Sequence, residues 1–453
     1  MNYALKFGVV KMLKKIIAFM LAGIMSVLMS GCMDTSVENM LSPPKLLDEQ
    51  NEIYNELIKS VGQGVKLVYP RSGEYRSAFV IYDFDEEPGD EALVFYESKN
   101  TAAGEVALRM RIFDKVDGKF ETVYDIACAG SEVERIRFER LGKGGDINII
   151  VQYTLLNQTE KVFSVYKYEN HTPVERYSST YVCLDVFDIN GDGADELITV
   201  NYDKTTQTSS AMMFADEEEG FAKLSQTNLY GGTADYIGVT AGMLSDDKAA
   251  LFLDYSKGSG QSGTDVIYCV SNKLYCPNSD NSNIVRVTND YMSEIYCCDI
   301  DGDGLVEIPS TRILPGYETQ SRNEQLYAVE WYTVASNRFV LEHYSYFSNK
   351  YHFALIFPSR WQGVVTAVPD FTRSEVVFIS YDERMGLDLE NAAEIMRVRV
   401  VDKDDERGLE DAKELMFIGE TDETYYCIAQ QSGSGVGKLA LTESELKNCF
   451  KIL

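Results

Sequence analysis

Residue types that mark several common functions are scarce in this sequence. Its 453 residues include three histidines, His171, His343 and His352, and no two of them have the H-x3-H type of spacing found in zinc sites, so a catalytic zinc site is not expected. Positive charge is also in deficit, because 42 lysines and arginines stand against 71 aspartates and glutamates and leave a net charge of −29. This balance argues against a nucleic-acid partner and against docking on an anionic lipid surface by charge.

Complete catalytic motifs are missing as well. Residues 258–265, "GSGQSGTD", contain serines but no G-x-S-x-G nucleophile elbow, and we interpret them as a flexible loop. Residues 432–439, "SGSGVGKL", begin with serine instead of glycine and have Leu439 where a phosphate-binding loop needs Ser or Thr for Mg²⁺, so a hairpin loop is expected. A glycosidase-type pair of carboxylates stays open, because its geometry is spatial. With no catalytic constellation visible, we expect that the protein is not an enzyme.

The sequence also lacks an apolar run long enough for a comfortable transmembrane span, which takes ~20 residues. The apolar stretch 16–32, "IIAFMLAGIMSVLMSGC", follows several lysines and indicates a signal peptide. Its end resembles a lipobox, in which cleavage leaves Cys32 as a lipid-carrying N-terminus. We therefore expect a lipoprotein signal peptide over 1–31, a polar tether over 32–46, and a protein anchored by lipid at the extracytoplasmic face of the cell membrane. Ordinary secretion, with Cys32 as a plain residue, is the alternative.

What the sequence does contain is a repeated acidic motif. Residues 188–200 read "DINGDGADELITV", and residues 299–308 read "DIDGDGLVEI". Both copies have oxygen-bearing side chains at positions 1, 3, 5 and 9, while position 7 would offer its backbone carbonyl. Like charges this close repel one another unless a cation lies among them, and hard oxygen ligands at alternate positions suit Ca²⁺. The predicted ligands are Asp188, Asn190, Asp192, Ala194 and Glu196 in the first copy, and Asp299, Asp301, Asp303, Leu305 and Glu307 in the second.

The motif is not an EF-hand loop. The twelfth position is Thr199 in one copy and Ser310 in the other, and neither can be a bidentate carboxylate. The flanking residues are typical of strands, whereas an EF-hand needs helices. A third, degraded copy, "DFDEEPGDEALVFY", has Pro88 in place of a glycine, and its weaker candidate ligands are Asp83, Asp85, Glu87, Gly89 and Glu91. An acidic turn without metal is the alternative for every copy.

The acidic motif belongs to a longer repeat. Small polar turns followed by apolar strands also begin at Arg140 and Met243, midway between the acidic copies, and each unit is long enough for about four short strands. These units resemble the FG-GAP or VCBS repeat, the calcium-loop blade also seen in integrin α-type propellers, and the whole layout resembles bacterial VCBS-repeat lipoproteins. The resemblance implies a mainly β fold with a β-propeller over 47–350, led by a helix, and Ca²⁺ as cofactor. It implies no activity.

After residue 350 the acidic motif stops. Apolar stretches such as "EVVFISYD" predict further strands, and the segment "LTESELKNCFKIL" opens with a capping box from Thr442 to Glu445 that predicts a helix. We expect a small α+β domain over 351–453. It resembles the C-terminal domain of the same lipoprotein family through "FPSRW" and this helix.

The cysteines give one candidate disulfide. Apart from Cys32, the others stand mostly in apolar strand segments, where buried free thiols are common. Cys269 and Cys276 would face each other across a hairpin if Asn272 and Lys273 formed a two-residue turn, so a disulfide between them stays open.

The sequence as a whole predicts a lipid-anchored, calcium-binding propeller at the cell surface that acts as a non-enzymatic binding or scaffold module, with a surface protein or a glycan as ligand. One alternative is a secreted enzyme that acts on glycan or peptide and uses the propeller as its scaffold. Such an enzyme needs a pocket with convergent carboxylates or a nucleophile–base pair. Another alternative is an accessory subunit of an envelope complex.

Overall fold

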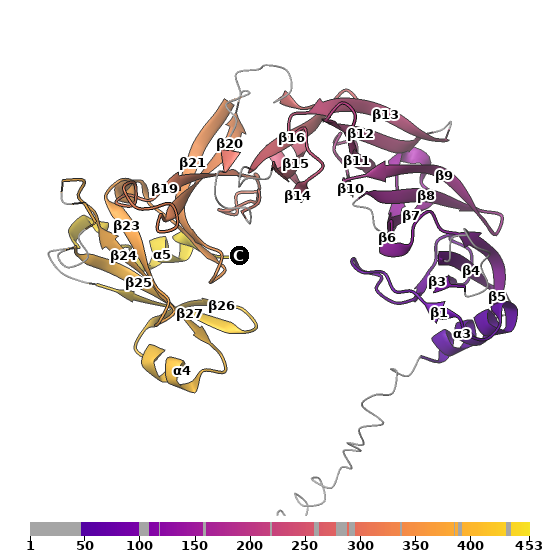
Figure 1. Cartoon of the computed structure of the whole chain (residues 1–453), viewed down its shortest axis with the longest axis horizontal. Coiled ribbons are helices and arrows are strands. Elements are labelled where there is room, and N and C mark those ends of the chain that lie inside the picture. Colours follow the sequence, from indigo (N-terminus) through magenta and orange to yellow (C-terminus); the bar gives the residue numbers. More distant parts are fainter. Residues whose placement is uncertain are drawn as a thin grey trace, which may run out of the picture. The chain divides into compact units, whose positions relative to one another are not determined.

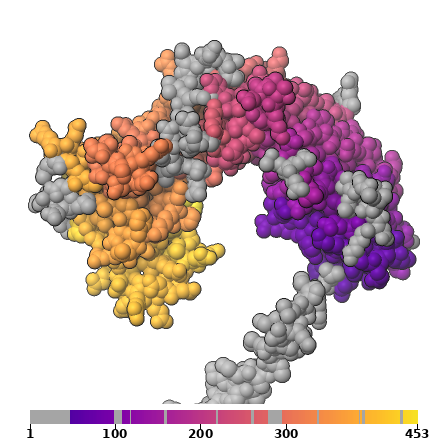
Figure 2. Space-filling view, in the orientation of Figure 1, coloured from indigo at the N-terminus to yellow at the C-terminus, as the bar shows by residue number. Residues whose placement is uncertain are grey.

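The computed structural model describes residues 47–98, 108–116, 118–156, 160–217, 220–257, 262–277, 288–289, 295–335, 338–384, 386–387, 392–431 and 436–453, the coloured residues of Figure 2. The expected signal peptide over 1–31, the lipidated Cys32 and the tether over 32–46 lie outside these residues. Within the described part of the chain, no helix is long and apolar enough to cross a membrane.

The described residues form a mainly β structure of antiparallel sheets, as the sequence predicted (Figure 1). The helix α3 (Asp48–Val61) precedes the first sheet. That sheet contains β1 (Lys66–Leu67), β2 (Phe79–Tyr82), β3 (Glu91–Glu97), β4 (Leu108–Val116) and β5 (Lys119–Ala127). The second contains β6 (Glu132–Arg140), β7 (Ile147–Thr154), β8 (Lys161–Glu169) and β9 (Thr172–Tyr181).

Two further sheets follow in the same manner. The third contains β10 (Cys183–Phe187), β11 (Glu196–Asp203), β12 (Thr208–Glu217) and β13 (Gly220–Leu229). The fourth contains β14 (Tyr236–Ser245), β15 (Lys248–Ser256), β16 (Ser262–Val270), β17 (Lys273–Tyr275) and β18 (Thr288–Asn289). Neighbouring strands in these sheets are mostly consecutive in sequence, because antiparallel strands need only a short turn between them.

The last two sheets are less sequential. The fifth joins β19 (Ile308–Ile313), β20 (Tyr327–Ala335), β21 (Arg338–Ser348), β22 (Phe353–Ile356) and, much later in the chain, β28 (Phe450–Ile452). The sixth has the order β23 (Val365–Asp370), β24 (Glu375–Ser380), β25 (Glu394–Asp402), β27 (Thr424–Gln430) and β26 (Met416–Glu420). The fifth sheet therefore spans residue 350, the boundary expected between propeller and α+β domain. That division stays a prediction.

Burial explains why the strands take these places. The strands β3, β7, β11 and β15 read as almost continuous apolar runs and are buried along most of their length, whereas β13 contains more polar residues and is only partly buried. Strands covered on both faces can be apolar throughout, and strands with one face in water alternate. Glu91 opens β3 and Glu196 opens β11, so the acidic motif enters directly into a buried strand.

The sixth sheet contains a buried ion-pair network. Two short helices belong to the same part of the chain: α4 (Glu406–Ala412) lies between β25 and β26, and α5 (Glu443–Cys449) follows β27. Glu375 is 1% exposed and pairs with Arg397 at 3.1 Å and with Arg399. The predicted capping box of α5 is confirmed, since the Thr442 side chain and Glu445 bond to each other's backbone N–H groups.

The disulfide that the sequence left open between Cys269 and Cys276 is absent, because the turn lies one residue earlier than its formation would need. Ser271 and Asn272 have positive φ of 51° and 60° and form the turn, so Cys269 lies opposite Leu274 rather than Cys276. Cys276 stays on the same buried face as Cys269 but is displaced along the hairpin, so the two thiols are not opposite each other. All the cysteines in the described residues have free thiols.

Candidate metal centres

The acidic loop 188–196 is folded around the side chain of its first residue. Asp188 Oδ1 accepts hydrogen bonds from the backbone N–H groups of Gly191 (2.7 Å) and Asp192 (3.1 Å), and Oδ2 accepts one from Gly193 (2.8 Å). The side-chain oxygen of Asn190 accepts the Asp192 N–H at 2.9 Å. Gly191 and Gly193 have φ of 73° and 88°, which glycine adopts without strain. The glycines therefore allow the tight turn that holds positions 1, 3 and 5.

The acidic loop 299–307 repeats this pattern bond for bond. Asp299 accepts the N–H groups of Gly302 (2.7 Å), Asp303 (3.1 Å) and Gly304 (2.9 Å), and Asp301 accepts that of Asp303 at 3.0 Å. Asp299, Asp301 and Asp303 each place a carboxylate oxygen within 4.8 Å of the other two. Oxygen ligands lie about 2.3–2.6 Å from a calcium ion, so oxygens at this separation can share one ion.

Position 7 closes the turn in both loops. The Ala194 N–H donates to Asp192 Oδ1 at 3.1 Å, and the Leu305 N–H donates to Asp303 Oδ1 at 2.8 Å. These bonds fix the backbone at the residues whose carbonyl groups the sequence proposes as ligands. The ligand role of the two carbonyl groups stays a prediction.

The ninth residue of each loop is a glutamate removed from water. Glu196 is 2% exposed and accepts the Ile189 N–H at 3.2 Å, while Glu307 is 1% exposed and accepts the Ile300 N–H at 2.9 Å. Burial, with a further contribution from the loop aspartates, raises the pKa of each glutamate to about 7. The charged form of a buried carboxyl group is disfavoured unless an opposite charge lies beside it. A cation in the loop would supply that charge, so the residues present fit a divalent metal ion.

In each acidic loop, one aspartate forms an ion pair with a basic side chain. Lys143 Nζ lies 3.0 Å from Asp192 Oδ2 and lowers the pKa of that carboxyl group. His343 Nε2 lies 2.7 Å from Asp301 Oδ2, and Lys451 donates to the Asp301 backbone oxygen at 2.9 Å. Among the described residues, the remaining carboxylates of the two loops form no ion pair.

The degraded loop 83–91 loses part of this hydrogen-bond pattern. Asp83 accepts one backbone N–H from the loop, that of Glu86 at 2.8 Å. Pro88 occupies position 6, where Gly193 donates to Asp188 in the intact loop. Proline has no N–H and its φ is fixed near −65°, so it cannot make that bond or take that conformation.

Three of the weaker candidate ligands in the degraded loop still lie close together. Asp83, Asp85 and Glu91 have oxygen atoms within 4.8 Å of one another, whereas Glu87 is exposed and belongs to no such group within the described ranges. Glu91 is 1% exposed, and burial raises its pKa to about 8. Gly89, with a φ of 135°, contributes backbone alone.

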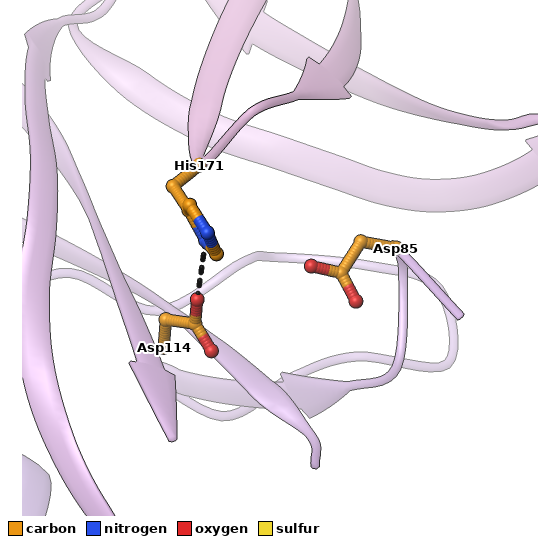
Figure 3. A group of neighbouring side chains, drawn as sticks. All are labelled: Asp85, Asp114 and His171. Carbon is orange, nitrogen blue, oxygen red and sulfur yellow. Dashed lines mark hydrogen bonds and ion pairs between the residues drawn. The ribbon is translucent and has the colours of Figure 1, made fainter. Parts of the chain in front are cut away.

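Two residues that the sequence did not predict join this degraded loop. Asp114 on β4 and His171 in the turn between β8 and β9 lie beside Asp85, and one ligand atom of each lies within 4.8 Å of the others (Figure 3). His171 Nδ1 lies 2.6 Å from Asp114 Oδ2. The histidines were set aside because no two are close in sequence. No sequence signal could show that one histidine meets carboxylates from two other segments.

A pocket of about 630 Å³ was also not predicted. It lies where the fifth and sixth sheets meet, and its lining includes Arg312, Glu318, Glu330, Tyr344, Tyr381 and Glu383. Arg312 Nη1 pairs with Glu330 Oε1 at 3.1 Å. Burial raises the pKa of Tyr381, and the nearby charges of Glu318 and Glu383 raise it further. Small-molecule sites commonly have about 300–1,000 Å³ and a few convergent polar groups.

Comparisons with known proteins give distant similarities. No family model and no curated protein matches the chain. An exotype rhamnogalacturonan lyase has a TM-score of 0.28 and 10% identity over 70% of this chain and 72% of that one. A rhamnogalacturonan lyase from Bacillus licheniformis has a TM-score of 0.29 and 10% identity over 70% and 74%. The periplasmic gluconolactonase of Pseudomonas aeruginosa has a TM-score of 0.26 and 10% identity over 70% and 84%.

These comparisons correct one expectation from the sequence. All the named structures are enzymes, which contradicts both the expected non-enzymatic binding or scaffold module and the expectation that the protein is not an enzyme. That expectation rested on the absence of linear motifs, whereas carboxylates from separate segments converge in the pocket between the last two sheets. At TM-scores below 0.5, the similarities assign no reaction and no substrate to this chain.

Proposed function

We propose that the chain binds Ca²⁺ at the acidic loops 188–196 and 299–307 and that the ions stabilise the sheets into which these loops lead. The observation that supports this most is the repetition of one hydrogen-bond pattern in two separate loops, each of which ends on a buried glutamate. The ligands would be the oxygens at positions 1, 3, 5, 7 and 9. When bound, the ion would neutralise these carboxylates and tie the loop to the buried strand that follows.

The proposal extends to fold and cellular address. We propose that the antiparallel sheets over 47–350 are blades of an FG-GAP or VCBS-type propeller, that 351–453 is an α+β domain, and that lipid on Cys32 holds the protein at the extracytoplasmic face of the membrane. The support is the series of four- and five-stranded sheets together with the acidic motif that opens two of their buried strands. Extracellular Ca²⁺ modules bind at ~10⁻⁴ to 10⁻³ M, which suits an exported protein.

Thermal unfolding of the full-length chain tests the calcium proposal. Millimolar Ca²⁺ should raise the melting temperature above that in chelator, because a ligand that binds the native state alone stabilises it. The increase should disappear in the double variant Asp188→Ala with Asp299→Ala. A control variant is Asp203→Ala, which removes a carboxylate that accepts N–H groups in an ordinary turn. An unchanged melting temperature at millimolar Ca²⁺ would show that the loops are bare acidic turns.

A second candidate function, enzymatic action on a glycan or a peptide, is favoured by the pocket between the fifth and sixth sheets. Its carboxylates, guanidinium group and phenols come from separate segments and provide both acid–base groups and hydrogen-bond partners for a polar substrate. The test is incubation of the full-length chain with cell-wall glycans and peptides, with product release as the readout. Turnover should be lost in Glu330→Gln or Glu383→Gln and kept in Glu443→Gln, whose carboxylate is on the exposed side of α5. Equal turnover in all variants would exclude this pocket.

A further inference from the structure

We propose that Asp85, Asp114 and His171, called the Asp85 cluster, form a site for a divalent transition-metal ion of the Zn²⁺ class, separate in chemistry from the calcium loops. The three residues come from the loop before β3, from β4 and from the β8–β9 turn, so the site links the first and second sheets (Figure 3). One ligand atom of each lies within 4.8 Å of the others. At metal–ligand distances of about 2.0–2.2 Å, small side-chain rotations bring such atoms onto one ion.

The donor set distinguishes this cluster from the acidic loops. The loops offer oxygen alone, which suits Ca²⁺, whereas the Asp85 cluster adds an imidazole nitrogen to two carboxylates. Imidazole nitrogen favours Zn²⁺ and its neighbours in the first transition series. His171 Nδ1 already lies 2.6 Å from Asp114 Oδ2, so the ring is oriented toward the carboxylate with which it would share the ion.

The position of the histidine is not explained by the turn that it forms. Asn170 and His171 both have positive φ, 51° and 59°, and join β8 to β9 as a two-residue turn. Such turns favour glycine at the second position, where a side chain is strained. The histidine therefore costs backbone energy and brings an imidazole ring over the degraded loop.

A buried hydroxyl group beside the cluster is an independent sign of a missing ligand. Tyr168 is 8% exposed, and its hydroxyl group has no hydrogen-bond partner among the described residues. The ring packs edge-on against Phe84 at 4.8 Å and against the His171 ring at 6.5 Å. Tyr168 therefore lies against Phe84 of the degraded loop and against His171 of the cluster. An unpaired buried hydroxyl group is costly, and a bound ion or its water would give it a partner.

The charge around the cluster also lacks compensation. Asp83, Asp85 and Glu91 have oxygen atoms within 4.8 Å of one another, and an oxygen atom of Asp114 lies within the same distance of Asp85. Among the described residues, His171 is the one basic side chain that pairs with any of these four carboxylates. The degraded loop has Pro88 where the two acidic loops have a glycine. In the proposed site, His171 from the second sheet supplies a nitrogen ligand.

Calorimetric titration of the full-length chain with Zn²⁺ tests the proposal. The titration is run with 5 mM Ca²⁺ present, so that Ca²⁺ occupies oxygen sites. The variants are His171→Gln, Asp114→Asn and the control His352→Gln, which removes an exposed histidine remote in sequence from the cluster. Co²⁺ substitution gives a second readout, because its visible absorption changes when the ligand set or the coordination geometry changes.

We expect at least a tenfold loss of Zn²⁺ affinity in His171→Gln and in Asp114→Asn, and none in His352→Gln. The Ca²⁺-dependent rise in melting temperature should persist in His171→Gln, which shows that the variant is folded. The double variant Asp188→Ala with Asp299→Ala should still bind Zn²⁺, so this proposal and the calcium proposal can fail separately. Equal Zn²⁺ affinity in wild type and His171→Gln, or an unchanged Co²⁺ spectrum, would overturn the site.

Discussion

The buried glutamates of the acidic loops should make the metal-free protein less stable as the pH rises. The pKa of Glu196 and of Glu307 is about 7 in the folded chain, against an ordinary value of 4.5. A carboxyl group with a raised pKa favours the folded state when it is protonated. Its stabilising contribution is therefore complete below pH 4.5 and is lost as the pH rises through about 7.

The expected size of this effect is large compared with the stability of a typical protein. A pKa difference of one corresponds to ~1.4 kcal/mol, so each glutamate should lower the free energy of unfolding by about 3 kcal/mol between pH 4 and pH 8. Glu91, with a pKa of about 8, adds a contribution of the same sign. Calcium should act in the opposite direction, because it binds the ionised form, and it should add ~2.7 kcal/mol per site when its concentration is 100 times the Kd.

Urea unfolding of the full-length chain at pH 5 and pH 8, in chelator and in Ca²⁺, measures both effects. Trp331 and Trp361 are fully buried, so their fluorescence reports unfolding. In chelator at pH 8, the variant Glu196→Gln with Glu307→Gln should be more stable than the wild type, and it should gain little from Ca²⁺. Metal-free stability that stays level or rises between pH 5 and pH 8 would refute the reasoning, as would a Gln variant less stable than wild type at pH 8.

Three further outcomes are expected. Replacing Glu87 by Asp together with Pro88 by Gly should increase Ca²⁺ affinity at the degraded loop, since it restores the short carboxylate and the N–H donor; isothermal titration that finds no additional site would contradict this. Lys143→Ala should tighten Ca²⁺ binding by about two- to threefold, because the lysine competes for Asp192 in an exposed and therefore weak ion pair, and weaker binding would speak against it. Glu375→Ala should lower the free energy of unfolding by about 3–5 kcal/mol, because it leaves two arginines without their buried partner, and a loss below 1 kcal/mol in urea unfolding would exclude that role.

The features that the sequence predicted well are local ones. In the acidic loops, the turn glycines, the oxygen-bearing side chains and the following strand lie within about a dozen residues, so their spacing alone defines the hydrogen-bond pattern, while the ligand role of these side chains stays a prediction. The strand predicted after the first acidic motif is β11 (Glu196–Asp203), because β-branched residues and the preceding turn define where it begins. The hairpin near Cys269 failed by one residue, because two dipeptides there could form the turn and the choice between them depends on packing.

The features that the sequence missed depend on contacts between distant segments. His171 meets Asp114 across 57 positions, and one pocket is lined by Arg312 on β19 and by Tyr381, which directly follows β24. Neither arrangement has a linear pattern, since each requires knowledge of which strands are neighbours. The absence of catalytic motifs was therefore weak ground for expecting a module without catalysis.

The pairing of β28 with β22 has a consequence for how the protein is made. The whole sixth sheet is translated between these two strands, so the fifth sheet has an unpaired edge at β22 until residues 450–452 leave the ribosome. An open strand edge is a template for pairing with other chains. The sixth sheet should fold first and hold the two partners near each other, and the nascent chain should be most prone to aggregation while β22 waits for its last neighbour.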